Sequence, residues 1–425
     1  MHRAVRSIVV AACVAASLAI APGCATRSRG ALTEAELAAR RDEYVRTAAR
    51  ENYDDATLLL GRMRREVDDF AAGRSSAPPT LDILVVSGGG DYGAFGAGFL
   101  EGWGTVTDPQ WKRPEFDVVT GVSTGALIAP FAFIGDHESY ERVLRIYRAP
   151  KKDWFTIRGL LFFLPHNESF ASIDGLRRDV RSEYDEEIVR KVAAGRREGR
   201  LIAIAATNLD YGMRRVWDLG RESERVLAGD DIARVHERLL ASAAIPAVFP
   251  PVEIDGCLYV DGSVTSNILY NANMRSPASV VHRWKEAYPQ TPMPAIRVWV
   301  IINGQLMPPP QVTAPTWIAV TAASTGAVVR SAMITALEQL ATELALLEAV
   351  DGVRSEFYVV AIPDAWRPPK EGLFEPETMK ALADLGRELG ANPQSWHQGT
   401  VLPQQLVPSG VDDAAPIGAA DPPVR

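Results

Sequence analysis

Cysteine and histidine are scarce in this sequence of 425 residues. The three cysteines are Cys13, Cys24 and Cys257, and the first two lie in or beside an apolar N-terminal run, so Cys257 stands alone in the rest of the chain. We therefore expect no intrachain disulfide. The six histidines are scattered and lack the close spacing of metal ligands, so we expect neither a metal centre nor a cofactor.

The chain also lacks an excess of positive charge. It holds 45 Lys and Arg against 53 Asp and Glu, a formal net charge of -8, which argues against the basic surface that nucleic-acid binding requires. With 47% hydrophobic and 23% charged residues, the composition is that of a globular protein rather than of a disordered or collagen-like chain. The length allows one large domain or two of ordinary size.

The N-terminus is typical of a secretory signal. Two arginines precede an apolar run at residues 8–21, which is shorter than a membrane span. Small residues before Cys24 resemble the lipobox of bacterial lipoproteins, although Ala21 departs from that pattern. We expect residues 1–23 to be removed and Cys24 to carry a lipid that anchors the protein to a membrane of the cell envelope. The alternative is ordinary cleavage near Ala25, which gives a secreted or periplasmic protein.

A helical segment and a linker follow. Thr33 and Glu36 have the spacing of a capping box, and residues 33–72 are rich in helix formers, so we expect one or two helices there. Residues 73–80 contain Gly, Ser and Pro and indicate a linker. The predicted organisation is a signal peptide at 1–23, an anchor, helical segment and linker at 24–80, a catalytic domain at 81–402, and a Pro-rich disordered tail at 403–425.

Short apolar runs alternate with helical stretches through the main domain. The runs are typical of strands that are covered on both faces. They occupy residues 81–87, 116–122, 201–207, 215–219, 296–302 and 356–362. Strands that alternate with helices predict an α/β fold, a three-layer α/β/α sandwich with a mainly parallel central sheet.

A glycine-rich loop follows the first strand. Gly88, Gly90 and Gly93 satisfy the G-x-G-x-x-G pattern of dinucleotide-binding folds, but that reading needs an acidic residue at the tip of the second strand, where this chain has Ser123. The three consecutive glycines, which include Gly89, instead indicate an anion hole built from backbone N–H groups. A turn needed only for close packing is the alternative.

The second strand runs into the pattern G-x-S-x-G. Gly121 and Gly125 flank Ser123 between a predicted buried strand and a predicted helix, which is the setting of a nucleophile held on a sharp turn. Thr124 can add its N–H to the anion hole from the first turn of that helix. The alternative is a small serine in a tight turn.

A serine nucleophile needs a base. His282 and His397 follow Ser123 in the chain, but neither lies beside a turn that suggests a site. Asp261 ends a short predicted strand and is followed by Gly262, so its carboxylate can closely approach another strand end. Taken alone, this pair of residues is more typical of a turn than of a catalytic site.

Four motifs together point to a family. GGGDYG, GVSTG, ASAAIP and DGS occur in this order, and over Leu81–Tyr270 the chain closely resembles the patatin-like phospholipases. The resemblance implies a Ser–Asp dyad of Ser123 and Asp261, an oxyanion hole from Gly88–Gly90, and hydrolysis of acyl esters of lipids. Two positions depart from the family pattern: Tyr92 replaces a basic residue, which bears on phospholipid as substrate, and Ser263 replaces a smaller residue.

Two further segments bear on the substrate. Residues 153–170 are rich in aromatic and aliphatic side chains from Trp154 onward and predict either a membrane-touching loop over an acyl groove or a buried element. A run from about Ala319 to Val350 predicts a packed helix of the sandwich or of a smaller cap against it. The expected partner is a lipid or acyl-ester substrate, with a membrane reached through the anchor. An acyltransferase, an esterase for small esters, and a non-catalytic envelope scaffold are the alternatives.

Overall fold

The computed structural model describes residues 32–399, apart from residues 152, 155, 158–168, 170, 271–273 and 275. The predicted signal peptide, the lipidation site Cys24 and the predicted disordered tail lie outside the described residues. So does most of the apolar part of the segment 153–170.

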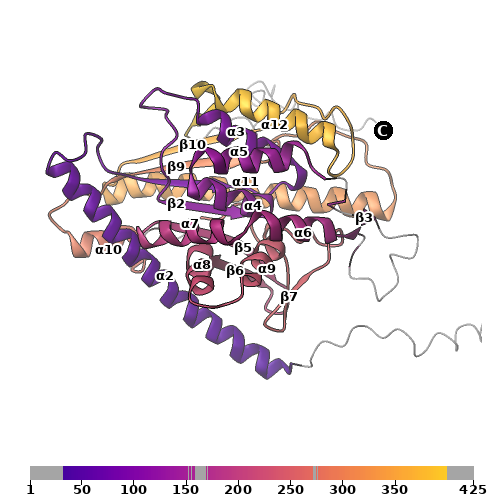
Figure 1. The fold of residues 1–425 in the computed structure, drawn as a ribbon, viewed down its shortest axis with the longest axis horizontal. Coiled ribbons are helices and arrows are strands. Elements are labelled where there is room, and N and C mark those ends of the chain that lie inside the picture. The colour runs from indigo at the N-terminus through magenta and orange to yellow at the C-terminus, as the bar shows by residue number, and fades with distance from the viewer. Residues whose placement is uncertain are drawn as a thin grey trace, which may run out of the picture.

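A nine-stranded, mainly parallel sheet forms the centre of the molecule (Figure 1). The parallel strands lie in the order β10, β9, β1, β2 and β5, and antiparallel strands flank them. The parallel strands are β1 (Thr80–Val86), β2 (Val118–Val122), β5 (Leu201–Asn208), β9 (Ala295–Ile302) and β10 (Ser355–Ala361). The antiparallel strands are β6 (Met213–Asp218), β7 (Val252–Ile254), β8 (Cys257–Asp261) and β11 (His397–Gln398). A small separate sheet pairs β3 (Thr156–Ile157) with β4 (Ala171–Ser172).

Helices cover both faces of this sheet, which confirms the predicted α/β sandwich. The larger core cluster contains apolar side chains of α3, α4, α5, α7 and α12, and Figure 1 shows α3, α5 and α12 together on one side of the sheet. The second cluster contains side chains of α2, α10 and α11 against the other face. The helices are α2 (Glu34–Ala71), α3 (Gly93–Trp103), α4 (Thr124–Ile134), α5 (His137–Arg148), α6 (Asp174–Glu183), α7 (Glu186–Arg197), α8 (Leu219–Leu227), α9 (Ala233–Ser242), α10 (Val280–Ala287), α11 (Trp317–Asp351) and α12 (Pro376–Gly390).

The predicted N-terminal helical segment is one long helix, α2. Its capping box is formed as expected, because Thr33 and Glu36 bond each other's backbone N–H groups. The helix lies along the domain rather than apart from it: Arg62 Nε donates to the buried carboxylate of Asp117 at 2.6 Å, and Arg196 Nη2 donates to Asp55 at 2.9 Å. These ion pairs hold α2 against the N-terminal end of β2 and against α7.

The helix α11 differs from the packed helix that the sequence predicts. Its second part, from Met333 to Leu347, buries apolar side chains in the core against β9 and β10, whereas its first part is largely exposed although it is uncharged as far as Val329. A helix of 35 residues is about 50 Å long, roughly twice the length of these strands, so one part must extend past the sheet. By length and composition alone, Ala319–Asp351 of α11 is long and apolar enough to cross a membrane, and 17% of its most apolar stretch of 18 residues is buried.

The buried ion pair between α2 and the sheet gives a stability prediction. Replacing Arg62 by Met leaves the carboxylate of Asp117 buried without its cation, which we expect to lower the free energy of unfolding by about 3–5 kcal/mol. Burial raises the pKa of Asp117 and Arg62 opposes that rise, so the loss should shrink at acidic pH, where the carboxyl is protonated. Urea unfolding measures both effects. Arg46→Met, which breaks the exposed pair with Glu43, should cost less than about 1 kcal/mol, and equal losses for the two variants would contradict the prediction.

Candidate active site

Ser123 lies on a strained turn between β2 and α4. Its φ of 54° and ψ of -123° are unusual for a residue with a side chain, and such strain is concentrated at functional sites. The turn requires the two flanking glycines. A Cβ on Gly121 would lie 2.2 Å from the carbonyl oxygen of Gly125, and a Cβ on Gly125 would lie 2.2 Å from that of Val86. The pattern G-x-S-x-G therefore has the strand-to-helix context that it predicts.

The backbone of Ser123 is held from the end of α9. Its N–H donates to Oγ of Ser242 at 3.0 Å, and the Ser242 hydroxyl donates in turn to the carbonyl oxygen of Ala205 on β5 at 2.6 Å. The sequence motif ASAAIP contains Ser242, but the pattern alone does not indicate what this residue does. Its hydroxyl holds the backbone N–H of Ser123, which lies 119 positions earlier in the chain.

Asp261 faces Ser123 across the end of β2. The hydroxyl of Ser123 donates to Oδ2 of Asp261 at 2.5 Å, and both side chains are buried. The register of β5 explains this approach. β2 pairs with β5 as far as Ala205, and β8 pairs with β5 from Ala206, the partner of Asp261. Since β6 occupies the other edge of β5, β2 and β8 meet end to end on one edge.

Burial sets the ionisation of Asp261. Desolvation raises the pKa of this carboxyl, and hydrogen bonds from Ser123 and from the N–H of Ser263, the latter at 2.8 Å to Oδ1, oppose the rise. Ser263 contributes a backbone N–H that any residue except proline supplies, so its departure from the family pattern leaves this contact in place. A carboxylate with a raised pKa is a stronger base when it is ionised.

The histidines considered as alternative bases lie elsewhere. His282 is on α10 and pairs with Glu286 at 3.3 Å, and His397 is exposed on β11 at the far edge of the sheet. The buried His236 bonds the carbonyl oxygen of Tyr184 through Nε2 at 2.8 Å. Within the part of the chain that the structure describes, Asp261 is the titratable group that bonds the Ser123 hydroxyl.

The glycine loop brings backbone N–H groups to the same place, with one correction to the sequence prediction. The N–H of Gly88 donates to the carbonyl oxygen of Asn267 at 3.1 Å, so it is already used and is not a donor of an anion hole. Gly89 and Gly90 have N–H groups with no partner among the described residues, and Gly90 needs its positive φ of 60° to turn the loop. The N–H of Thr124, the first residue of α4, likewise has no hydrogen-bond partner in the part of the chain that the structure describes.

Close packing explains the remaining glycines of the motifs. A Cβ on Gly93 would lie 2.0 Å from Oγ1 of Thr124, and a Cβ on Gly262 would lie 2.3 Å from the carbonyl oxygen of Ala205. Thr124 is held further by the buried hydroxyl of Tyr147, which donates to its carbonyl oxygen at 3.3 Å and bonds its hydroxyl. The loop and the start of α4 are thus pressed together around Ser123.

Tyr92 stands in the glycine loop where the family pattern has a basic residue, and Asp91 precedes it. The ring of Tyr92 packs edge-on against Trp366 with centroids 5.8 Å apart. Burial raises the pKa of Asp91 to about 6, and this carboxyl accepts a hydrogen bond from the N–H of Phe374 at 3.0 Å. The loop therefore presents no positive side chain at the position where the family pattern has one.

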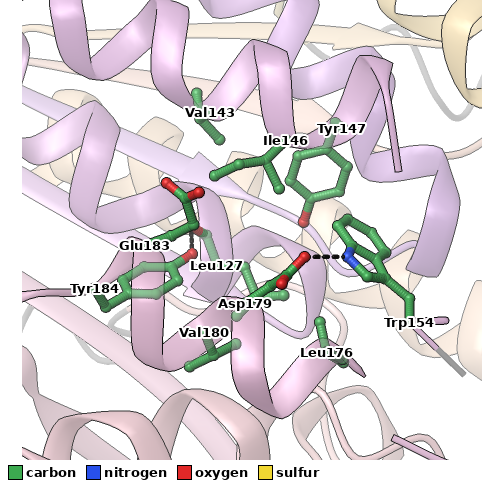
Figure 2. A pocket seen from close by; sticks show the side chains of 10 residues that line it. All are labelled: Leu127, Val143, Ile146, Tyr147, Trp154, Leu176, Asp179, Val180, Glu183 and Tyr184. Carbon is green, nitrogen blue, oxygen red and sulfur yellow. Dashed lines mark hydrogen bonds between the residues drawn. The ribbon is translucent and has the colours of Figure 1, made fainter. Parts of the chain in front are cut away.

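Trp154 corrects one reading of the segment 153–170. Its indole is buried and Nε1 donates to Oδ2 of Asp179 at 2.8 Å, so this residue is not part of an exposed aromatic surface. Figure 2 shows Trp154, Asp179 and Tyr147 around a mostly apolar cavity of about 20 Å³, the space of about one water molecule.

Among the described residues no three His, Cys, Asp or Glu side chains gather as metal ligands.

Comparisons with known proteins find a family model that matches the part of the chain that contains this site. Residues 84–272, which include the glycine loop, Ser123 and Asp261, match the family model described as patatin-like phospholipase. Among solved structures, the crystal structure of VipD from Legionella pneumophila is similar to 76% of this chain and 68% of its own, with 9% sequence identity and a TM-score of 0.37. No curated protein matches the chain.

The burial of Asp261 gives a prediction about stability. Its folded pKa lies above the unfolded value, so the wild type loses stability as pH rises through the folded pKa and the carboxyl ionises. Asp261→Asn keeps the shape and removes that ionisation, so at neutral pH we expect it to be more stable than the wild type by about 1–3 kcal/mol.

Thermal and urea unfolding from pH 4 to 8 test this difference, which should disappear at the acidic end. Asp179→Asn is the matched control, because Asp179 is also buried but is paired with Lys151 at 2.8 Å, and its loss should destabilise the protein. An Asp261→Asn variant that is less stable than the wild type at pH 7 contradicts the prediction.

Proposed function

Since residues 84–272 belong to the patatin-like phospholipase family, we propose that the protein is a serine hydrolase that cleaves acyl esters of lipids through Ser123 and Asp261. The observation that carries the proposal is the 2.5 Å hydrogen bond from the hydroxyl of Ser123, on its strained turn, to the buried carboxylate of Asp261. The N–H groups of Gly89, Gly90 and Thr124 in this region have no partner among the residues that the structure describes, and they support the proposal as donors to an oxyanion.

In the first half of the reaction Asp261 is the base. Oγ of Ser123 bonds the carbonyl carbon of the ester while its proton passes to Oδ2 of Asp261, and the carbonyl electron pair moves onto oxygen, which becomes an oxyanion. The oxyanion then re-forms the C=O bond and the bond to the alcohol oxygen breaks. The departing oxygen takes the proton from Asp261, which leaves an acyl group on Ser123.

Water completes the cycle through the same two residues. As a water oxygen bonds the acyl carbon, Asp261 accepts a proton from it, and the second tetrahedral intermediate forms. Its collapse breaks the bond to Oγ of Ser123, which recovers the proton from Asp261, and the fatty acid leaves. No other side chain is required to move a proton, so a dyad without histidine is sufficient.

The exposed part of α11 supports a lipid rather than a small soluble ester. Met333 follows the exposed part directly, and its sulfur accepts a hydrogen bond from the side-chain amide of Asn267. The backbone carbonyl oxygen of Asn267 accepts the N–H of Gly88, so the exposed part of α11 ends next to the glycine loop. Val320 and Val328 are 48% and 65% exposed there, and an apolar surface of this kind matches a membrane or lipid aggregate. A lipid on Cys24, as the N-terminal motif predicts, would keep the domain at such a surface.

Covalent labelling tests the dyad. A fluorophosphonate probe should label the wild type and not Ser123→Ala, and Asp261→Asn should lower the labelling rate by about 10²–10⁴ because the serine then lacks its base. Burial raises the pKa of Asp261, so the wild-type rate should fall on acidification at a higher pH than an ordinary aspartate would give.

His282→Gln is the control for this experiment and should label like the wild type. Labelling that survives Asp261→Asn at full rate removes Asp261 as the base. If no form of the folded protein is labelled, the hydrolase proposal fails and the non-catalytic scaffold remains.

Surface variants of α11 test the lipid substrate. Replacing Val320 and Val328 by Glu should reduce hydrolysis of vesicle lipids at least about tenfold, because charges at the apolar surface oppose contact with lipid. Turnover of a soluble short-chain ester should stay within twofold, since the dyad is untouched. Val350→Glu, at the other end of the same helix and 59% exposed, should leave both activities unchanged. Equal loss on both substrates would argue for damage to the fold, and no loss on vesicles would remove α11 from lipid contact.

A further inference from the structure

The side chain of Asn267 is buried at the site with one end unpartnered. Asn267 is 6% exposed, and its Oδ1 has no hydrogen-bond partner among the described residues. Buried amides ordinarily satisfy both ends, so an open end beside a reactive serine calls for an explanation.

The open end lies on the same side of Gly88 as Ser123. A Cβ built on Gly88 would lie 2.4 Å from Oδ1 of Asn267 and 3.1 Å from Cβ of Ser123, so both atoms are close to that one point. The backbone of Asn267 is tied to the same place, since its carbonyl oxygen accepts the N–H of Gly88. The amide therefore lies close to Gly88 and to Ser123, the residue that an ester carbonyl must approach.

The other end of the amide is weakly held. Its Nδ2 donates to the thioether sulfur of Met333 at 3.5 Å, and a thioether is a weak acceptor. A half-turn about the Cβ–Cγ bond exchanges Nδ2 and Oδ1 and gives up that bond alone. The side chain can thus turn its NH2 group toward Ser123 at small cost.

These contacts also change the set of donors available for an oxyanion. Asn267 takes up the N–H of Gly88 with its backbone, and its own side chain offers a donor in the neighbouring position. Resting on the proposed function, we propose that the side-chain amide of Asn267 donates a hydrogen bond to the ester carbonyl oxygen as that oxygen becomes an oxyanion. It acts beside the N–H groups of the glycine loop and of Thr124, so Asn267 is a further catalytic residue.

The role predicts a specific kinetic pattern. A donor that binds the oxyanion more strongly than the neutral carbonyl raises kcat and leaves KM nearly unchanged. Removing one such donor lowers kcat by about 10²–10³. We therefore expect Asn267→Leu, which keeps the volume, and Asn267→Ala to lose about that factor in kcat with KM within threefold of the wild type.

The experiment measures kcat and KM on a soluble short-chain ester, the inhibition constant of a trifluoromethyl ketone, and the melting temperature. The ketone forms a tetrahedral adduct with the serine, so its binding to the two variants should weaken by a factor similar to the loss in kcat. Met333→Leu is the matched control, because it removes the partner of the amide and retains the volume. It should keep kcat within twofold.

Each outcome decides the matter. A kcat within fivefold of the wild type in both Asn267 variants overturns the proposal, as does an unchanged affinity for the ketone. A loss that Met333→Leu shares, or that follows the melting temperature, shows a role in packing and also overturns it. Failure of the proposed function is a separate result, since the wild type would then neither turn over the ester nor bind the ketone.

Discussion

The hydrogen bond between Ser123 and Asp261 depends on a change of partner along one edge of β5. β2 runs parallel to β5 and leaves it at Ala205, and β8 runs in the opposite direction and joins it at Ala206. The carboxyl ends of two strands therefore meet head to head, and the last residue of β8 is brought against the first residue after β2. Backbone register sets this approach, which no loop or long side chain has to bridge. The rest of the site is arranged around that point.

Burial has two opposite effects at this point. It raises the pKa of Asp261 and so makes its carboxylate a better base, but it also makes the ionised form costly to the fold. The positive φ of Ser123 adds a strain of about 1–3 kcal/mol. Contacts that do not take part in proton transfer offset these costs: Ser242 holds the N–H of Ser123, and Ser263 donates to the carboxylate. The strained arrangement of Ser123 and Asp261 is kept because several independent contacts hold the same two residues in place.

Local patterns made much of this structure predictable. The strands, the capping box of α2 and the turn at Ser123 follow from residues within a few positions of one another, and the structure contains all of them. The partner of the Gly88 N–H was not predictable, because it lies on Asn267, far along the chain, and depends on how the segment after β8 crosses the sheet. The bond from Ser123 to Ser242 is hidden for the same reason.

The sequence predicts a packed helix for α11, which is correct for its second part and wrong for its first part, for a different reason. Its first part has small and apolar residues on every side, so periodicity cannot separate a buried face from an exposed one. Only the mismatch in length between a helix of 35 residues and strands of five to eight shows that one end must overhang.

The exposed first part of α11 and the glycine loop together bear on which substrate the proposed enzyme recognises. The loop carries Tyr92 in place of a cation, so it offers no charge to attract a phosphate. Asn267 links this loop to Met333, where the uncharged and exposed first part of α11 ends, and an apolar surface there favours acyl chains over charged head groups. The chemistry at Ser123 acts on the ester carbonyl alone and is indifferent to what lies beyond it. Selection under the proposed function therefore falls to the apolar surface, and it concerns whether the ester is presented from a lipid phase more than which head group it bears.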